Sequence, residues 1–246
     1  MKEVLFINYL SSDTENMKNY KKQHHLFVTT AYYNQPNCRC SLINGQAGKD
    51  RFIEGLKLLK EAKTKVNCPV MYLDNDCVLM NRVDPLFDDY DFDVAVVYRF
   101  PHETHHGRND CLGGFLFFSQ KRKDAEDQFL HKLITRTEER YQQELDQGID
   151  PWFYDQAAIN DIVGTPSRER TWNEYSFAFD YEPCPKDVDG VKVLFISANE
   201  WACPSTFVRT PQKVYIFHYN HVIHFKRVKN ASIQDESLCC EESDAE

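Results

Sequence analysis

Short apolar runs alternate along the chain with polar segments whose apolar residues recur at helical spacing. Runs rich in β-branched and aromatic residues predict strands, whereas apolar positions three and four residues apart predict helices. Strands separated by helices are typical of an α/β domain with a mostly parallel central sheet flanked by helices. We expect strands at residues 4–8, 26–33, 69–73, 93–98, 114–119, 191–196 and 213–218, and helices at residues 17–24, 50–63, 124–144 and 155–163.

Two of these predicted strands, residues 93–98 and 114–119, are apolar without alternation. A strand has this composition when both faces of its sheet are covered. The chain has 246 residues, 42% of them hydrophobic, and shows no internal repeat or interior linker. A chain of this size buries a substantial core, so we expect one domain over residues 1–230. No apolar run reaches the roughly 18 residues of a membrane span, and no span is predicted.

Charge is distributed unevenly along the chain. The formal net charge is −9, but residues 231–246 hold six acids and no Lys or Arg, which leaves 32 acids against 29 bases in residues 1–230. We expect the acidic tail to be disordered and to take no part in chemistry. The net charge of −9 argues against a nucleic-acid partner, although the body without its tail is nearly neutral.

The cysteines and the N-terminus indicate a cytoplasmic protein with mostly reduced thiols. The nine cysteines, an odd number at irregular spacing, give neither a disulfide framework nor a paired zinc-binding signature. The first apolar run, residues 4–7, is too short for the core of a signal peptide. Cys38 and Cys40 could bind a metal with His24 and His25, but we favour loop cysteines of no special role.

Pairs of aspartates separated by one residue occur four times, of which chance accounts for about two. Asp74 and Asp76 differ from the others because they follow an apolar run, residues 70–73, at a strand end where open α/β sheets bind ligands. In an extended segment both side chains point to the same side, and two adjacent carboxylates need a cation between them. Mg²⁺ or Mn²⁺ bound to a diphosphate suits such oxygen ligands. Residues 88–93, also rich in aspartate, are interpreted as surface.

Histidines and basic residues gather near the end of the predicted domain. Residues 214–229 contain His218, His221 and His224, followed by Lys226 and Arg227. A histidine at the end of an apolar strand can complete a metal site, and the cations that follow suit phosphate oxygens. His218, directly at the strand end, is the preferred ligand, with His221 and His224 as alternatives.

The order of these motifs, over about residues 3–229, resembles the GT-A glycosyltransferases that use nucleoside-diphospho-sugar donors. Residues 74–76 are similar to the family's metal-binding DxD motif, and residues 109–114 to the start of its acceptor-side strand. Residues 154–160 resemble its Asp-Gln-x-x-Ile/Leu-Asn helix start, and residues 172–173 its later Trp/Tyr-Asn element. The C-terminal motif departs from the family's His-x-x-Gly-x-x-Lys pattern, because His221 stands in place of Gly and His224 in place of Lys.

The resemblance implies a single GT-A domain, Rossmann-like, that moves a sugar from a nucleoside diphosphate, with UDP favoured, to an acceptor hydroxyl on a glycan or glycoprotein. It implies Mn²⁺ or Mg²⁺ as cofactor, on Asp74, Asp76 and His218, and it favours retention over inversion. Asp155, with Gln156 beside it, would act as general base in an inverting enzyme, or as nucleophile or stabiliser of the cationic sugar in a retaining one. A capping role at the helix start is the alternative for Asp155.

Donor contacts are also expected from the resemblance. Two adjacent glycines let a ligand approach the backbone closely, although a simple bulge would explain them equally well. The polar residues 101–110, with three histidines, would border the acceptor site as a substrate-binding loop or lid, although we favour a flexible solvated loop without such a role. The expected donor-binding residues are Asn8, Tyr9, Ser12, Arg51, Lys57, Asp74, Asn75, Gly113, Gly114 and Lys226.

Two other functions share part of this pattern. A sugar-1-phosphate nucleotidyltransferase has the same architecture and acidic metal site, but it needs a Gly-rich phosphate loop after its first strand, and residues 1–41 contain no glycine. Walker-type and dinucleotide-binding fingerprints are also absent from the sequence. A non-catalytic nucleotide-sugar or glycan-binding protein would keep its function after Asp74→Ala and Asp76→Ala.

Overall fold

A seven-stranded sheet forms the centre of the protein, with the strand order β2-β1-β3-β6-β5-β10-β9. The computed structural model describes residues 3–11, 17–45, 51–98, 111–148, 153–164, 171–173, 178–180, 183–204 and 214–218. The strands are β1 (Val4–Ser11), β2 (Cys38–Gly45), β3 (Val70–Leu73), β5 (Val94–Tyr98), β6 (Cys111–Phe118), β9 (Cys184–Val188) and β10 (Val191–Ser197). Five strands run in one direction, whereas β6 is antiparallel to β3 and β5, and β9 is antiparallel to β10. The predicted α/β fold with a mostly parallel sheet is confirmed.

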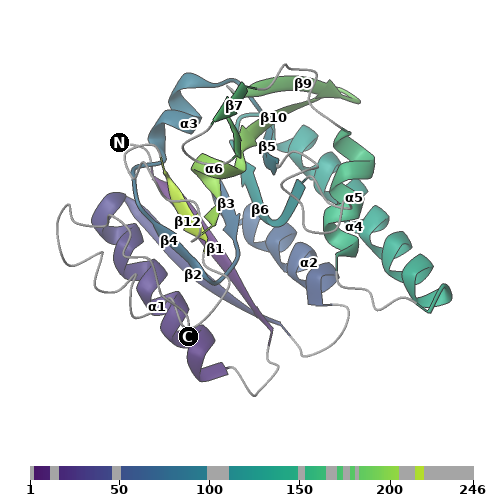
Figure 1. The fold of residues 1–246 in the computed structure, drawn as a ribbon, viewed down its shortest axis with the longest axis horizontal. Coiled ribbons are helices and arrows are strands. Elements are labelled where there is room, and N and C mark those ends of the chain that lie inside the picture. Colours follow the sequence, from purple (N-terminus) through teal and green to yellow (C-terminus); the bar gives the residue numbers. More distant parts are fainter. Residues whose placement is uncertain are drawn as a thin grey trace.

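Helices cover both faces of this sheet (Figure 1). Every residue of β5 and β6 is buried, as predicted for strands covered on both sides. Apolar residues on one face contact α2 (Arg51–Thr64), α4 (Lys123–Asp146) and α5 (Tyr154–Val163). Those on the other face contact α1 (Met17–Asn34), α3 (Asp84–Asp89) and α6 (Ala198–Trp201). Helices α2, α4 and α5 match the predicted helices within a few residues.

The prediction of a strand at residues 26–33 is wrong, because α1 continues without interruption from Met17 to Asn34. Its buried residues recur at helical spacing and face the sheet: Gln23, Leu26, Phe27, Thr30 and Ala31. Thr30 Oγ1 donates to the carbonyl oxygen of Leu26 at 3.2 Å and to that of Phe27 at 2.9 Å. Packing of this apolar face outweighs the weak preference of β-branched residues for strands.

Strand β2 lies where the sequence predicts a loop. Cys38 and Cys40 belong to this edge strand, which pairs in parallel with β1, so the interpretation as loop cysteines is wrong. Their Sγ atoms lie 4.0 Å apart, and both are free thiols, as are Cys68, Cys77, Cys111 and Cys184. No His or acidic side chain in those ranges joins them in a possible metal group. The surface interpretation of residues 88–93 is wrong for Asp93, which is 1% exposed and ion-paired with Arg122.

A second, three-stranded sheet has the order β11-β12-β4. It consists of β4 (Cys77–Leu79), β11 (Cys203–Pro204) and β12 (Ile216–His218), and a separate pair is formed by β7 (Thr171–Asn173) and β8 (Ala178–Asp180). Antiparallel pairing of β12 with β4 sets His218 opposite Cys77, directly beyond the end of β3. Among the described helices, none combines the length and the hydropathy needed to cross a membrane. The predicted tail, residues 231–246, lies outside the described residues.

Candidate active site

The Asp74-Asn75-Asp76 turn connects β3 of the central sheet to β4 of the small sheet. The Asp74 backbone N–H donates to the Gly114 carbonyl oxygen of β6 at 2.9 Å, which fixes where the chain leaves the central sheet. Asp76 directly precedes Cys77, the residue that pairs with His218. The register of two sheets therefore brings two carboxylates and one imidazole to the same place.

The distances in this group suit a divalent cation. His218 Nε2 lies 3.1 Å from Asp76 Oδ1 and 3.7 Å from Asp74 Oδ2. One ligand atom from each of the three residues lies within 4.8 Å of the others, and no other such His, Cys or acidic group occurs in the described part of the chain. Neighbouring ligands of an octahedral Mg²⁺ or Mn²⁺ lie about 3 Å apart, so small side-chain shifts complete the geometry. Carboxylate and imidazole ligands are among those that divalent metal ions use in proteins.

The charges around Asp74 act on its pKa in opposite directions. Burial raises the pKa of Asp74 to about 6, and the negative charge of Asp76 adds to the shift, while His218 and Arg51 oppose it. The Phe115 ring packs edge-on against the imidazole of His218, with ring centres 5.1 Å apart, and restricts its orientation. A cation among these ligands would remove the repulsion between the two carboxylates.

Gly113 and Gly114 lie in a bulge of β6. The pairing of β6 with β5 shifts register between Val96, opposite Leu116, and Tyr98, opposite Cys111. A Cβ on Gly114 would overlap the Asp74 carboxylate, and a Cβ on Gly113 would overlap the carboxylate of Asp155. The bulge and the two missing side chains together let both carboxylates approach the same strand, so the two interpretations of these glycines are compatible.

Asp155, in the first turn of α5, is buried next to Gly113. Burial raises its pKa to about 7, while hydrogen bonds from the backbone of Gln156 and of Asp155 itself oppose the shift and the charge of Asp74 adds to it. Its Oδ1 and the Oε1 of Gln156 have no hydrogen-bond partner among the described residues. Asp155 also lines a small pocket, and the other residues that line it are aromatic, aliphatic or glycine: Phe52, Leu56, Tyr72, Gly113, Leu133 and Ile159.

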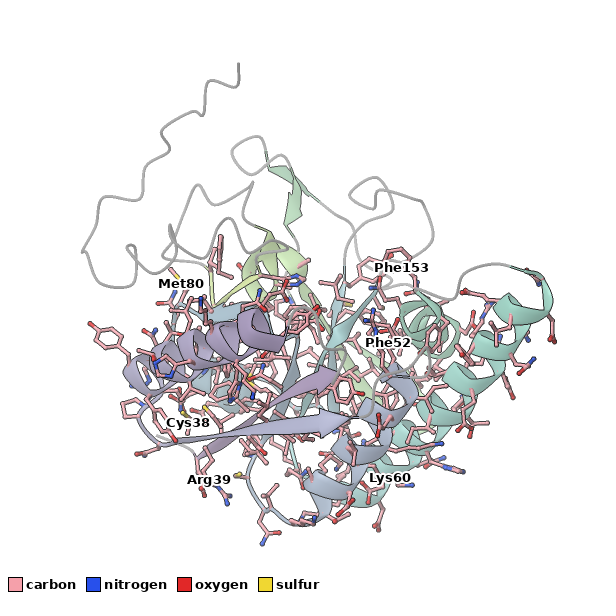
Figure 2. All side chains as sticks on the ribbon, turned by 90° about the horizontal axis from the view of Figure 1, so that it is seen from below. Cys38, Arg39, Phe52, Lys60, Met80 and Phe153 are labelled. Atoms are coloured by element: carbon pink, nitrogen blue, oxygen red, sulfur yellow. The ribbon has the colours of Figure 1, made fainter. Side chains whose placement is uncertain are left out.

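A buried carboxylate oxygen without a hydrogen-bond partner, such as Oδ1 of Asp155, is costly, and such groups concentrate at functional sites. Phe153 occupies the N-cap position of α5 and makes no side-chain cap, while Asp155 accepts from backbone N–H groups in the first turn, so the catalytic role and the helix-end role of Asp155 both stay predictions. Phe52 of α2 packs against Tyr154 of α5 with ring centres 5.6 Å apart, and Figure 2 shows Phe52 and Phe153 at the same end of the molecule. Asp155 is therefore held between two helix starts, at the edge of the core.

Two further residues lie beside the carboxylates. Arg51, the first residue of α2, lowers the pKa of both Asp74 and Asp155 through its positive charge. Tyr72 was not predicted as a site residue; burial and the charges of Asp74 and Asp155 raise its pKa well above the ordinary value. It therefore stays a neutral phenol. Its position two residues before Asp74, on the same side of the strand, was the available signal.

The other predicted donor-binding residues have protein partners. Tyr9 Oη donates to Glu54 Oε2 at 3.1 Å, and the Asn75 Nδ2 donates to the Tyr20 carbonyl oxygen at 2.8 Å, leaving its buried Oδ1 without a partner in the described ranges. Asn8 is fully buried below the metal-ligand group. Lys57 does not contact the Asp74, Asp76 and His218 group; it forms an ion pair with Glu138 of α4 at 2.7 Å.

Several predicted site residues lie outside the described ranges. These are Ser12, residues 101–110, His221, His224, Lys226 and Arg227. For Trp172 and Asn173 the structure describes the main chain only, as strand β7. Their predicted roles stay predictions.

Comparisons with known proteins agree with this architecture. No family model and no curated protein matches the sequence. A solved glycosyltransferase involved in glycosylation of the major capsid of PBCV-1 is similar in structure, with TM-score 0.58 and 10% identity over 94% of this chain and 99% of that one. Galactosyltransferase LgtC, solved with donor and acceptor sugar analogs, is similar with TM-score 0.52 and 12% identity over 89% of this chain and 87% of that one.

LgtC carrying an active-site glutamine-to-glutamate substitution is similar to the same degree, with TM-score 0.51 and 12% identity over 88% of this chain and 87% of that one. At such low identity the likeness establishes the fold, which extends over nearly the whole length of both proteins. The chain therefore has the fold of these glycosyltransferases, the GT-A fold, and its own Asp-x-Asp turn lies at the end of β3.

Proposed function

We propose that this protein is a metal-dependent glycosyltransferase that moves a sugar from a nucleoside diphosphate, preferably UDP, to an acceptor hydroxyl. One observation carries the proposal: Asp74 and Asp155 approach adjacent glycines of one bulged strand, and Asp74 shares a group of metal-ligand atoms with Asp76 and His218. A group that can bind a cation and a buried carboxylate, one oxygen of which has no partner in the described ranges, thus lie side by side, as a reaction that breaks a bond to a diphosphate requires.

The chain's own residues would hold and polarise the donor. A divalent cation on Asp74, Asp76 and His218 would supply positive charge to the diphosphate as it leaves. Arg51 adds a second positive charge near both carboxylates. Asp155, in its small and mostly apolar pocket, would face the sugar and either stabilise the positive charge that develops on it or accept the proton of the acceptor hydroxyl.

The family resemblance favours retention of the anomeric configuration, with Asp155 or Gln156 next to the anomeric carbon. The active site of LgtC contains a glutamine, the residue replaced in its mutant, which is in keeping with a role for Gln156, whose buried Oε1 has no partner in the described ranges. We further propose that the acceptor is a glycan or a glycoprotein. Two similar structures support this proposal: one enzyme is involved in glycosylation of a capsid protein, and the other was solved with an acceptor sugar analog. The anomeric proton of the product, read by NMR, decides between retention and inversion.

A panel of nucleotide sugars tests the function. The protein is incubated with each donor and Mn²⁺, and release of nucleoside diphosphate is measured with and without EDTA. We expect release from at least one donor, abolished by EDTA and by Asp76→Asn. The control is Asp189→Asn, in the exposed Asp-x-Asp of residues 187–189, which we expect to retain wild-type activity. If no donor is bound or hydrolysed and Mn²⁺ has no effect, the proposal is wrong.

A further inference from the structure

The Asn8 side chain joins three parts of the fold. It is fully buried, and its Nδ2 lies 3.2 Å from the carbonyl oxygens of both Leu73 and Asp74. Its Oδ1 lies 3.1 Å from Nδ1 of His24. Because two carbonyl oxygens can only accept, the amide nitrogen must face them and the amide oxygen must face His24. An amide oxygen can only accept in turn, so Nδ1 of His24 carries a proton.

These contacts hold the backbone of Asp74 from both sides. The Asp74 N–H donates to Gly114 of β6, and the Asp74 carbonyl oxygen accepts from Asn8 of β1. Both polar backbone groups of the first metal-ligand residue are therefore fixed by neighbouring strands. The direction in which its carboxylate leaves the chain is fixed with them, apart from rotation about its own side-chain bonds.

Helix α1 contacts the same turn a second time. The Asn75 amide nitrogen donates to the carbonyl oxygen of Tyr20 at 2.8 Å. Tyr20 and His24 are four residues apart and therefore lie on the same face of α1. One helix face thus supports two consecutive residues of the turn, Asp74 through His24 and Asn8, and Asn75 through Tyr20.

We propose that His24 is a positioning residue for metal binding, and that Asn8 transmits its effect to Asp74 instead of contacting the donor. The inference rests on the metal site of the proposed function and adds to it a support outside the ligand group. Without the His24 hydrogen bond, the Asn8 oxygen is buried without a partner, and the amide is no longer held in the orientation that fixes the Asp74 carbonyl. The carboxylate then loses its defined position relative to Asp76 and His218. Outer hydrogen bonds of this kind contribute about 10- to 100-fold to metal affinity.

The test compares His24→Asn with His24→Gln. The amide nitrogen of Asn can occupy the position of the histidine Nδ1, whereas the longer Gln side chain places its nitrogen near the position of Nε2. Mn²⁺ affinity is measured by calorimetry on the full chain without donor. We expect His24→Asn to stay within about threefold of wild type, and His24→Gln and His24→Leu to lose about tenfold or more. Equal affinities for the Asn and Gln variants, or wild-type affinity for a folded His24→Leu, would overturn the proposal.

His25→Leu is the control, because His25 is an exposed neighbour of His24 on the same helix, and its Mn²⁺ affinity should equal that of wild type. If the wild-type protein binds no Mn²⁺, the proposed metal site itself is wrong. The His24 inference has a separate readout that needs no metal: nitrogen-detected NMR of the apo protein should show the neutral Nδ1–H tautomer. The opposite tautomer would refute the Asn8–His24 hydrogen bond as assigned and with it the positioning role.

Discussion

Two single-methyl substitutions at adjacent positions should separate metal binding from sugar transfer. A Cβ on Gly114 would overlap Asp74, and one on Gly113 would overlap Asp155. To regain ordinary contact distance, each carboxylate must move by more than about 1 Å. Since the overlapping atoms are ends of short side chains that can rotate, the fold should survive at a cost of about 1–3 kcal/mol.

We expect Gly114→Ala to weaken Mn²⁺ binding by about 10- to 100-fold, because the carboxylate of one ligand is displaced. Gly113→Ala should leave Mn²⁺ affinity within about threefold of wild type but slow sugar transfer by about 100-fold, because it displaces Asp155 from the reacting atoms. Calorimetry measures the Mn²⁺ affinity, and nucleotide release at saturating Mn²⁺ measures the rate of sugar transfer. Circular dichroism shows whether each variant is folded. A folded Gly114→Ala variant that binds Mn²⁺ like wild type would show that the reasoning about Asp74 is wrong.

Two further predictions concern stability. Lys63 and Glu126 form a buried ion pair at 2.6 Å, so Lys63→Met should lower the free energy of unfolding, measured by urea denaturation, by about 3–5 kcal/mol. The control is Lys65→Met, in an exposed pair with Glu61, which should change this free energy by less than about 1 kcal/mol. Equal effects of the two substitutions would contradict the prediction. Because burial raises the pKa of Asp155 to about 7 from 3.8, the folded state binds its proton more tightly, and the wild-type free energy of unfolding should fall as pH rises between these values. Asp155→Asn should remove this pH dependence, so the variant should be more stable to unfolding than wild type by about 4 kcal/mol at pH 8 and equally stable below pH 4. A stability difference between variant and wild type that stays the same from pH 4 to pH 8 would show that burial does not raise the pKa of Asp155.

The sequence predicts the helices and strands whose buried residues recur at regular spacing or form a continuous apolar run. The apolar runs that form β5 and β6, and the amphipathic α2, contain their own signal, and the predictions match the structure within a few residues. The second half of α1 was misassigned because residues such as Thr30 and Phe27 favour strands locally, while their burial against the sheet requires a helix. Strand β2 was missed because an edge strand with mixed composition has little periodicity of its own.

The candidate site was partly predictable for a related reason. Asp74 and Asp76 were recognisable from their place after an apolar strand, and His218 from its place at the end of another. Their proximity depends on the pairing of β12 with β4, which joins residues more than a hundred positions apart and has no local signal. The partly buried Asn8–His24 hydrogen bond depends likewise on how α1 packs beside β1, and it has no local signal in the sequence.

The central claim is that Asp74, Asp76 and His218 hold the divalent cation that carries the donor diphosphate. The most direct test is a calorimetric titration with the nucleotide sugar that the donor panel identifies. This donor is titrated into wild type and into Asp76→Asn, each with and without Mn²⁺. We predict that wild type binds the donor only weakly without Mn²⁺ and at least about tenfold more tightly with it, and that Asp76→Asn loses this gain. Equal, metal-independent donor binding by the folded variant and the wild type would contradict it.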